Sequence, residues 1–449
     1  MRRAVDHFGG ALVDSPRVSA LAKAVAAVTL VAASVIPAAA GGAAQSQVRG
    51  RASAPGIEAA FHRESYAPGD VASLELLHPT RGLTVQVMHA GVEPGRTHRR
   101  DVMRGVAVGP PIGLEEVAAH EPIRITMGPW PSGLYFARLR AADGKLGYAP
   151  FVLRPRRLGR YRVAVVLPTQ TWQAYNFRDD DGDGTSDTWY AGKRTARLGR
   201  PFLDRGVPPH FRHYDLPFLH WLARTGKHTD FLSDADLAHA PSATALAHAY
   251  DLIVFPGHHE YVTTREYDLV RGYRDLGGNL AFLSANNFFW RIVRHGQLME
   301  RTAQWRQLGR PEAALIGVQY RANDRGTRKG AWLVVGAHDP ALYALFAGTG
   351  LTDGSLFGRG GVEIDATTPS SPPGTHVVAE IPNIYGTGLT AQMTYYETSA
   401  GAKVFAAGAF LLVESVLEPD APLPDRPARR NAAGARRLLE NVWDTLSRP

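Results

Sequence analysis

The sequence contains no cysteine in its 449 residues. This absence excludes disulfide bonds, cysteine-ligated zinc sites, iron–sulfur clusters and a thiol nucleophile. No G-x-S-x-G elbow occurs, which argues against Ser-His-Asp hydrolysis, and no G-x-G-x-x-G follows the first buried strand, which argues against a dinucleotide cofactor. Beyond residues 1–44, no run approaches about 18 uninterrupted apolar residues, so we expect no membrane span in the mature chain.

A strong charge excess is also missing. Charged residues make up 20% of the chain, hydrophobic residues 45%, and the formal net charge is +8. This composition is typical of globular proteins and not of disordered chains. The basic residues are scattered along the sequence, so we do not expect nucleic acid as a partner. The length predicts two or three domains.

The first stretch has the pattern of an export signal. Arg2 and Arg3 open the chain, and an alanine-rich apolar run covers residues 21–40 and ends in small residues. A charged start, an apolar segment and an A-x-A-like end are the parts of a cleavable leader. We therefore expect a signal peptide at residues 1–44 and an exported protein; an uncleaved membrane anchor is the alternative.

Residues 48–157 have the pattern of a β-sandwich domain. Apolar and polar residues alternate over short segments, and Gly/Pro turns separate these segments. The pattern predicts several antiparallel strands that bury one face each. The clearest of them are VASLELL (71–77), LTVQVM (83–88), PIRITM (122–127) and GLYFARL (133–139).

Residues 158–449 change period and predict an α/β domain. RVAVVL (162–167), LIVF (252–255) and NLAFL (279–283) are continuous apolar runs, as expected of parallel strands that are buried on both faces. A helix pattern that ends at Gly277-Gly278 lies between the last two runs and makes a β-α-β unit. The second domain is therefore predicted to be a doubly wound, mostly parallel α/β sheet.

Polar side chains follow each of the three buried strands. Tyr175 comes after the first strand, His258 and Glu260 after the second, and Asn286 after the third. Because the carboxyl ends of parallel strands share one edge of a sheet, these side chains are expected to converge there. The H-x-E spacing is compatible with metal binding, and a hydrogen-bonded loop that closes the sheet edge is the alternative.

Three strings carry a resemblance to a known family: VLPTQTWQAYN, YDLIVFPGHHEYVTTREYDLVRGYRDLGGNLAFLSANNFFWR and AKVFAAGAF. They resemble the large (beta) subunit of N,N-dimethylformamidase and its relatives. The likeness covers most of residues 120–450 and, more loosely, residues 50–120. It implies a second domain with a fold like that of class I glutamine amidotransferases but without their cysteine, in agreement with the absence of cysteine here.

The resemblance also implies a mononuclear Fe³⁺ site. Its ligands would be two tyrosines and one glutamate, and the matching positions are Tyr135, Tyr175 and Glu260. His258, Asn286 and Glu397 match further residues of the family's site and would be catalytic. Phenolates and carboxylates are hard oxygen donors that suit Fe³⁺, and such an ion polarises an amide carbonyl for hydrolysis. Tyr135 in a strand could equally be a core residue, and Glu397 could pair with a surface arginine.

The resemblance leaves the partners open. The family's known enzyme is intracellular and works with a small partner subunit, whereas this chain carries an export pattern. A small partner subunit is therefore not implied for it, and a homo-oligomer remains open. Two functions follow: an exported metal-dependent hydrolase of amide C–N bonds in small molecules, or a non-catalytic exported protein that binds a carbohydrate or cell-wall ligand and keeps a relic enzyme fold.

A second metal site is predicted without any family. Asp179, Asp181 and Asp183 alternate before Gly184, and Asp187 stands at loop position nine. This is the opening of a calcium-binding loop, in which alternate carboxylates surround one ion and the glycine allows a sharp turn. Position twelve holds a tyrosine and not the glutamate of an EF-hand. The sequence therefore predicts a Ca²⁺ site outside the EF-hand class, and a solvated acidic turn is the alternative.

Overall fold

A computed structural model describes residues 56–95, 97, 99–418 and 422–448. The predicted leader at residues 1–44 lies outside them. None of the helices within the described ranges combines the length and the apolar character needed to cross a membrane.

The first region consists of two β-sheets that face one hydrophobic core. Strand β3 shows why: its buried and exposed residues alternate, so that Ala72, Leu74 and Leu76 all point to one side. The smaller sheet contains β1 (Ala59–Phe61), β3 (Val71–Leu76) and β7 (Ile123–Thr126). The larger contains β2 (Ser65–Tyr66), β9 (Leu146–Leu153), β8 (Gly133–Arg140), β4 (Thr80–His89), β5 (Val106–Ala107) and β6 (Ile112–Val117).

The second region is built on an 11-stranded sheet. Five neighbouring strands run parallel, in the order β12 (Asp230–Ser233), β10 (Val163–Leu167), β13 (Leu252–Phe255), β15 (Asn279–Phe282) and β23 (Lys403–Ala406). All five residues of β10 are buried, because Val163, Val165 and Leu167 belong to one core cluster and Ala164 and Val166 to another. The continuous apolar run therefore does indicate a strand with two covered faces.

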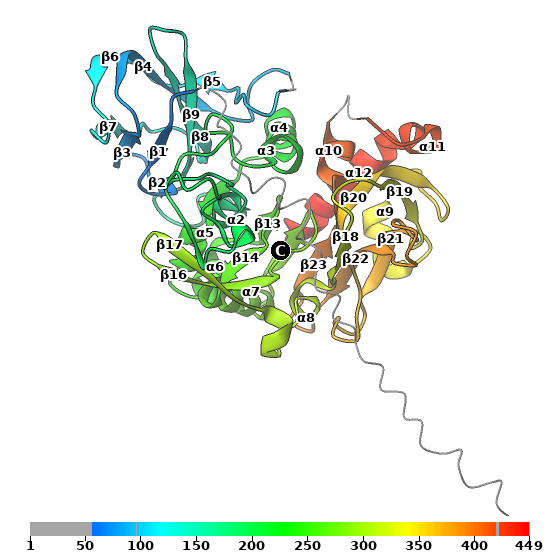
Figure 1. The fold of residues 1–449 in the computed structure, drawn as a ribbon. Coiled ribbons are helices and arrows are strands. Elements are labelled where there is room, and N and C mark those ends of the chain that lie inside the picture. The colour runs from blue at the N-terminus through cyan, green and yellow to red at the C-terminus, as the bar shows by residue number, and fades with distance from the viewer. Residues whose placement is uncertain (1–55, 96, 98, 419–421, 449) are drawn as a thin grey trace, which may run out of the picture. The chain divides into compact units, whose positions relative to one another are not determined.

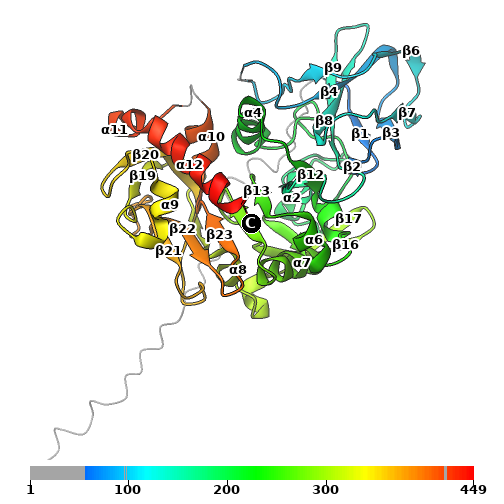
Figure 2. The same cartoon turned by 180° about the vertical axis from the view of Figure 1, so that it is seen from behind.

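Helices pack on both faces of this sheet. Helices α5 (Asp234–Ala238), α6 (Ala243–Ala249) and α7 (Thr264–Asp275) contribute to the second cluster, whereas α4 (Leu216–Arg224) and α12 (Ala432–Leu446) contribute to the first. Figure 2 shows α12 lying against the strands of the sheet, in contact with β15, β20 and β23. Helix α7 begins with a capping box in which Thr263 and Glu266 bond each other's backbone N–H groups.

The sheet as a whole is mixed, which differs from the predicted mostly parallel sheet. Beyond β23 every pairing is antiparallel. Strand β12 was missed because only two of its four residues, DFLS, are apolar. The antiparallel strands were missed because they lack the continuous apolar runs by which β10, β13 and β15 were found. They are β22 (Ala391–Glu397), β21 (His376–Ile381), β19 (Lys329–Val334), β20 (Leu356–Ala366), β18 (Gln319–Asn323) and β24 (Ala409–Phe410) (Figure 1).

The two regions share part of their core. Phe136 on β8 belongs to the same cluster as Val165 on β10 and Phe218 on α4. The Ser132 hydroxyl also accepts a hydrogen bond of 2.8 Å from the Phe231 backbone N–H on β12. The first sheet pair is therefore packed against the parallel sheet and is not joined to it by the connector alone.

A buried histidine ties three distant segments together. His220 on α4 lies between Glu418, 2.8 Å from its Nδ1, and Glu93, 3.4 Å from its Nε2. Burial lowers the pKa of His220, but the hydrogen bonds to Glu418 and Glu93 outweigh it and raise the pKa to about 9. Because the folded pKa lies above the unfolded one, this interaction stabilises the fold fully below about pH 6.5 and is lost as pH rises through 9.

We expect His220→Gln to unfold more easily than the wild type at pH 6, with a difference of roughly 3 kcal/mol that shrinks toward pH 9.5. Urea unfolding of both proteins across this range would measure it. His213→Gln is the matched control, since that partly exposed histidine also contacts a glutamate, Glu414. A difference that does not change with pH would contradict the assignment.

Candidate functional site

The predicted edge of the parallel sheet does collect polar side chains. Tyr175 ends helix α2 (Thr169–Ala174), which directly follows β10, and its hydroxyl donates a 2.5 Å hydrogen bond to Glu260 Oε2. His258 and Glu260 follow β13, and Asn286 follows β15. His258, Glu260 and Asn286 are each less than 9% exposed. The structure therefore brings together four of the six residues that the family resemblance indicated.

Glu363 on β20 is a member of this cluster that sequence reasoning missed. Its Oε2 lies 3.6 Å from His258 Nε2, which is itself 3.4 Å from Glu260 Oε2. Burial and then the charge of Glu260 raise the pKa of Glu363 well above its usual range. Two buried carboxyl groups that repel one another can hold a proton between them near neutral pH, and such a pair is typical of acid–base catalysis.

His258 is a neutral base between these two carboxyl groups. Burial, followed by His210 and His259, lowers its pKa well below the ordinary value. Its ring packs edge-on against Phe410, with the centroids 4.8 Å apart. His258 Nε2 is buried and has no hydrogen-bond partner within the described part of the chain. That nitrogen is available to accept a hydrogen bond or to bind a ligand.

Burial also raises the pKa of Glu260, to about 7, against the opposing hydrogen bonds of Tyr175 and Tyr261 and the charge of Arg301. The Arg301 guanidinium stacks over the Trp290 ring at 4.5 Å. Both residues belong to a separate four-stranded sheet of β11 (Thr195–Arg197), β17 (Leu298–Gln304), β16 (Trp290–His295) and β14 (Tyr261–Thr263). This small sheet thus supplies a positive charge on one side of the carboxylate.

Asn286 is held in a strained conformation. Its φ is +53°, a region that non-glycine residues rarely adopt. Its backbone N–H donates to both carboxylate oxygens of Asp365, each at 3.0 Å. The Asn286 Oδ1 atom is buried without a hydrogen-bond partner among the described residues. The strain and the missing partner are typical of a side chain kept in place for a ligand.

Three tyrosines surround Glu260. The ring centroid of Tyr175 lies 5.0 Å from that of Tyr190 and 6.2 Å from that of Tyr261, and the hydroxyls of Tyr190 and Tyr261 share a short hydrogen bond. Burial, then the Glu260 charge, raises the pKa of each of the three phenols well above 10. They are neutral phenols here, and only a strong cation would favour their ionised form.

Tyr135 is not part of this group. It lies on β8 in the core of the first region and is fully buried. Its hydroxyl donates to the Pro131 carbonyl at 2.8 Å, and its ring stacks on His89 with the centroids 4.4 Å apart. Tyr135 is therefore a core residue, which was the alternative considered for a tyrosine in a strand. The position beside Tyr175 that was expected for Tyr135 is occupied by Tyr190.

Glu397 is also placed elsewhere. It ends β22, where it pairs with Lys403 at the start of β23, and its side chain is exposed and bonded to the Tyr395 hydroxyl. Lys403 lies beside Asn279, the first residue of β15, and its backbone N–H donates to the Asn279 side chain. Glu397 thus lies at the amino ends of the parallel strands, at the opposite edge of the sheet from Glu260.

The direction of the strands explains why Glu363 reaches the site and Glu397 does not. Strand β22 is antiparallel to β23, so its last residue returns to the amino edge. Four antiparallel pairings separate β20 from β23, so β20 points the same way as the parallel strands, and Glu363 near its end reaches the carboxyl edge. The sequence offered only one weak signal for it, an acidic residue in the apolar stretch GRGGVEIDA.

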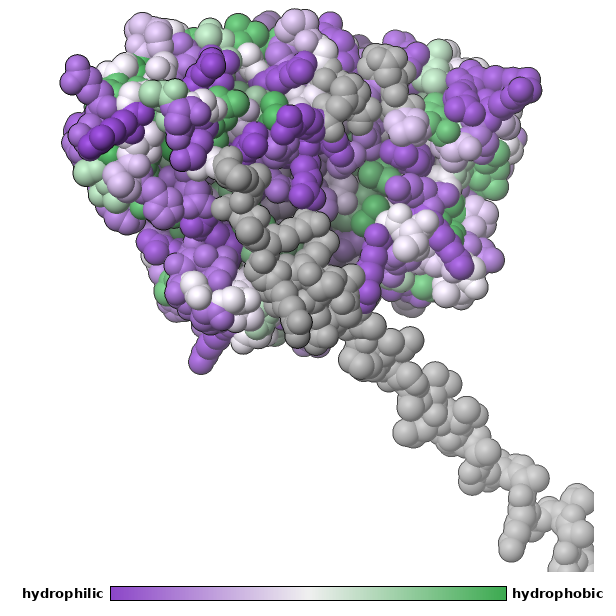
Figure 3. Space-filling model, turned by 45° about the horizontal axis from the view of Figure 1, so that its top comes forward, coloured by the Kyte–Doolittle hydropathy of each residue, from purple (hydrophilic) through white to green (hydrophobic). Residues whose placement is uncertain are grey.

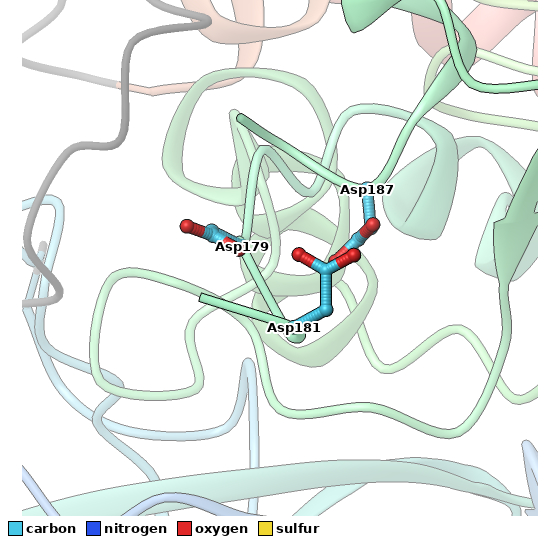
Figure 4. A group of neighbouring side chains, drawn as sticks. All are labelled: Asp179, Asp181 and Asp187. Atoms are coloured by element: carbon cyan, nitrogen blue, oxygen red, sulfur yellow. The ribbon is translucent and has the colours of Figure 1, made fainter. Parts of the chain in front are cut away.

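The aspartate loop is a second cluster. Carboxylate oxygens of Asp179, Asp181 and Asp187 lie within 4.8 Å of one another, and Figure 4 shows the three side chains on one loop. Asp183 is not in this group. The Lys193 ammonium lies 2.8 Å from Asp183 and 3.3 Å from Asp181, so a cation of the protein already balances part of the charge. The loop leads directly to Tyr190, the residue at loop position twelve.

We expect 1 mM Ca²⁺ to raise the melting temperature by at least about 1–2 °C over EDTA, because a ligand that binds only the native state stabilises it. Asp181→Asn should abolish this shift. Asp143→Asn, at an exposed turn that also pairs with a lysine, should keep it. A wild-type protein that melts identically in calcium and in EDTA would contradict the calcium prediction.

A comparison with protein families finds a match. Residues 120–416 match the family described as N,N-dimethylformamidase beta subunit-like, C-terminal. The chain belongs to this family. The matched segment contains Tyr175, His258, Glu260, Asn286 and Glu363, so the whole cluster lies within the family's domain. A comparison with curated proteins gives no match.

Solved structures add nothing to this assignment. A superoxide reductase (neelaredoxin) variant from Ignicoccus hospitalis matches at 12% identity and a TM-score of 0.16, over 22% of this chain and 82% of the other. A cycloisomaltooligosaccharide glucanotransferase from Paenibacillus sp. matches at 10% identity and a TM-score of 0.16, over 51% of this chain and 45% of the other. Scores this low carry no argument for fold or function.

Proposed function

We propose that this protein is a metal-dependent hydrolase of amide C–N bonds in small molecules. The observation that carries the proposal is the buried group of Tyr175, Glu260, His258, Asn286 and Glu363 at the carboxyl edge of the parallel strands. This edge is where ligands bind in open α/β sheets. The doubly wound, amidotransferase-like architecture is part of the same proposal, with the five parallel strands as its centre.

The residues present suit a ferric ion. Tyr175, Tyr190 and Glu260 offer hard oxygen donors, and Tyr175 and Glu260 already lie 2.5 Å apart. Buried polar atoms without partners in the described structure surround them: His258 Nε2, Asn286 Oδ1 and Glu363 Oε2. Such atoms are costly unless a ligand satisfies them. We therefore assign Tyr190, in place of Tyr135, as the second phenolate ligand.

A bound ferric ion would supply Lewis acidity toward the amide carbonyl and toward water. The chain's own groups supply the rest of the chemistry. Glu363 accepts the proton that water loses on attack and returns it to the departing amine. His258, held neutral by burial, hydrogen-bonds the same water. Asn286, fixed by Asp365, orients the substrate by accepting a hydrogen bond at its free Oδ1 from an N–H of the amide or from the bound water.

Metal analysis of the purified protein tests the proposal, together with its visible spectrum and amine release from a panel of formamides and acetamides. Bound iron, a purple or amber tyrosinate band and amine release would support it. Protein that binds no iron and releases no amine would refute it. The alternative of a non-catalytic, exported carbohydrate- or cell-wall-binding protein predicts ligand binding without amine release. Export itself rests on residues 1–44, and N-terminal sequencing of the mature protein tests it.

A further inference from the structure

A large groove lies away from the candidate metal site. Its volume is about 930 Å³, and it is lined by residues of the first region, of the connector after β9, of helices α5 and α6, and of strand β16. None of its lining residues belongs to the cluster around Glu260. A cavity of this size is large enough for a ligand with several charged groups.

The lining is strongly basic. It contains five arginines and two carboxylates, an excess of three positive charges, together with three histidines. Both carboxylates are already paired: Glu64 lies 2.9 Å from Arg294 Nη1, and Asp236 lies 3.2 Å from Arg154 Nε. The arginines with no partner among the carboxylates of the groove lining are Arg63, Arg156 and Arg157.

The positive charges of Arg156 and Arg157 are the least balanced by nearby carboxylates. Both are exposed, and neither forms an ion pair with any described residue. The Arg156 Nε donates a 2.8 Å hydrogen bond to the Pro68 carbonyl, which fixes the side chain without balancing its charge. The Arg63 guanidinium stacks over the Tyr66 ring at 4.5 Å and lies 3.5 Å from Asp70, outside the groove lining. The side chains of Arg156 and Arg63 are therefore held in place, and each keeps N–H donors that could bind an anion.

We propose that this groove binds a small phosphorylated molecule with two or more phosphoryl groups. Guanidinium groups donate paired N–H groups to phosphate oxygens, and a concave basic surface concentrates anions. Because the arginines come from separate segments, they suit a ligand with several phosphoryl groups better than a ligand with a single phosphoryl group. Figure 3 shows that hydrophilic residues predominate on the face it draws, with apolar residues scattered among them.

Titration calorimetry of the full chain with inorganic tripolyphosphate tests the proposal. We expect saturable binding with one site per chain, weaker binding of orthophosphate at matched ionic strength, and weakening as NaCl rises. The double variant Arg156→Ala/Arg157→Ala should bind at least tenfold more weakly. Arg157→Glu, at an exposed residue whose side chain forms no hydrogen bond or ion pair with the described residues, should show the same loss without risk to the fold.

The matched control is Arg436→Ala/Arg437→Ala. These two exposed arginines lie on α12, outside the groove, and their removal changes the net charge by the same amount. The control should keep wild-type affinity. Equal weakening in both double variants would show attraction by net charge alone and would overturn the proposal, as would wild-type protein that does not bind. None of these arginine variants should change the iron content, so the outcome of the binding experiment does not depend on the proposed hydrolase activity.

Discussion

Glu260→Gln is expected to lose both bound iron and amide hydrolysis. Glu260 offers the only carboxylate that is hydrogen-bonded to Tyr175 in the described structure, and a neutral amide in its place leaves the ion without that negative ligand. Loss of an outer partner of a metal ligand already costs roughly 10- to 100-fold in affinity, so loss of the ligand itself should cost more. Iron per chain, the tyrosinate band and amine release measure the result.

The same variant should fold at least as well as the wild type without metal. Burial raises the pKa of Glu260 to about 7, above its unfolded value, so ionising this group costs stability as pH rises from about 4.5. The amide oxygen of the substituted side chain can still accept the Tyr175 hydrogen bond, and the amide has no charge to bury. An equal or higher melting temperature of the metal-free variant would show that iron loss is not unfolding. Full iron content in Glu260→Gln would refute the ligand assignment.

Glu363→Gln is expected to keep its iron and to lose turnover by about 10²–10⁴, the range for removal of a general acid or base. Glu363 lies 3.6 Å from His258 Nε2, and Tyr175, Tyr190 and Glu260 remain to hold the metal. Burial and the charge of Glu260 raise the pKa of Glu363 well above its usual range, as is typical of carboxyl groups that serve as general acids or bases. Turnover of a small formamide, measured against iron content, separates this effect from metal loss.

Glu397→Gln is the control for both glutamate variants. It makes the same chemical change at an exposed residue of the same sheet, but at the amino edge of the parallel strands. We expect wild-type iron content and turnover. If Glu397→Gln abolished hydrolysis while Glu363→Gln did not, the site would be built differently from the arrangement described here.

The sequence by itself determined the three central strands of the parallel half of the second region. Continuous apolar runs identify β10, β13 and β15, because a strand covered on both faces must be apolar on both. The residues directly after these strands then had to share one edge, and Tyr175, His258, Glu260 and Asn286 do. The alternating aspartates likewise predicted a cluster, and three of the four come together because they lie within one short loop.

Only the tertiary structure decided which distant residues complete the site. Glu363 and Glu397 are both acidic residues on late strands, and chain order does not reveal which edge of an antiparallel sheet each one reaches. Tyr135 and Tyr190 flank Tyr175 in sequence, but packing sends Tyr135 into the first core and Tyr190 beside Glu260. The basic groove arises in the same way, because its arginines come from segments far apart in the chain. Local pattern specifies which face of a strand is buried, whereas strand order and packing determine what lies opposite it.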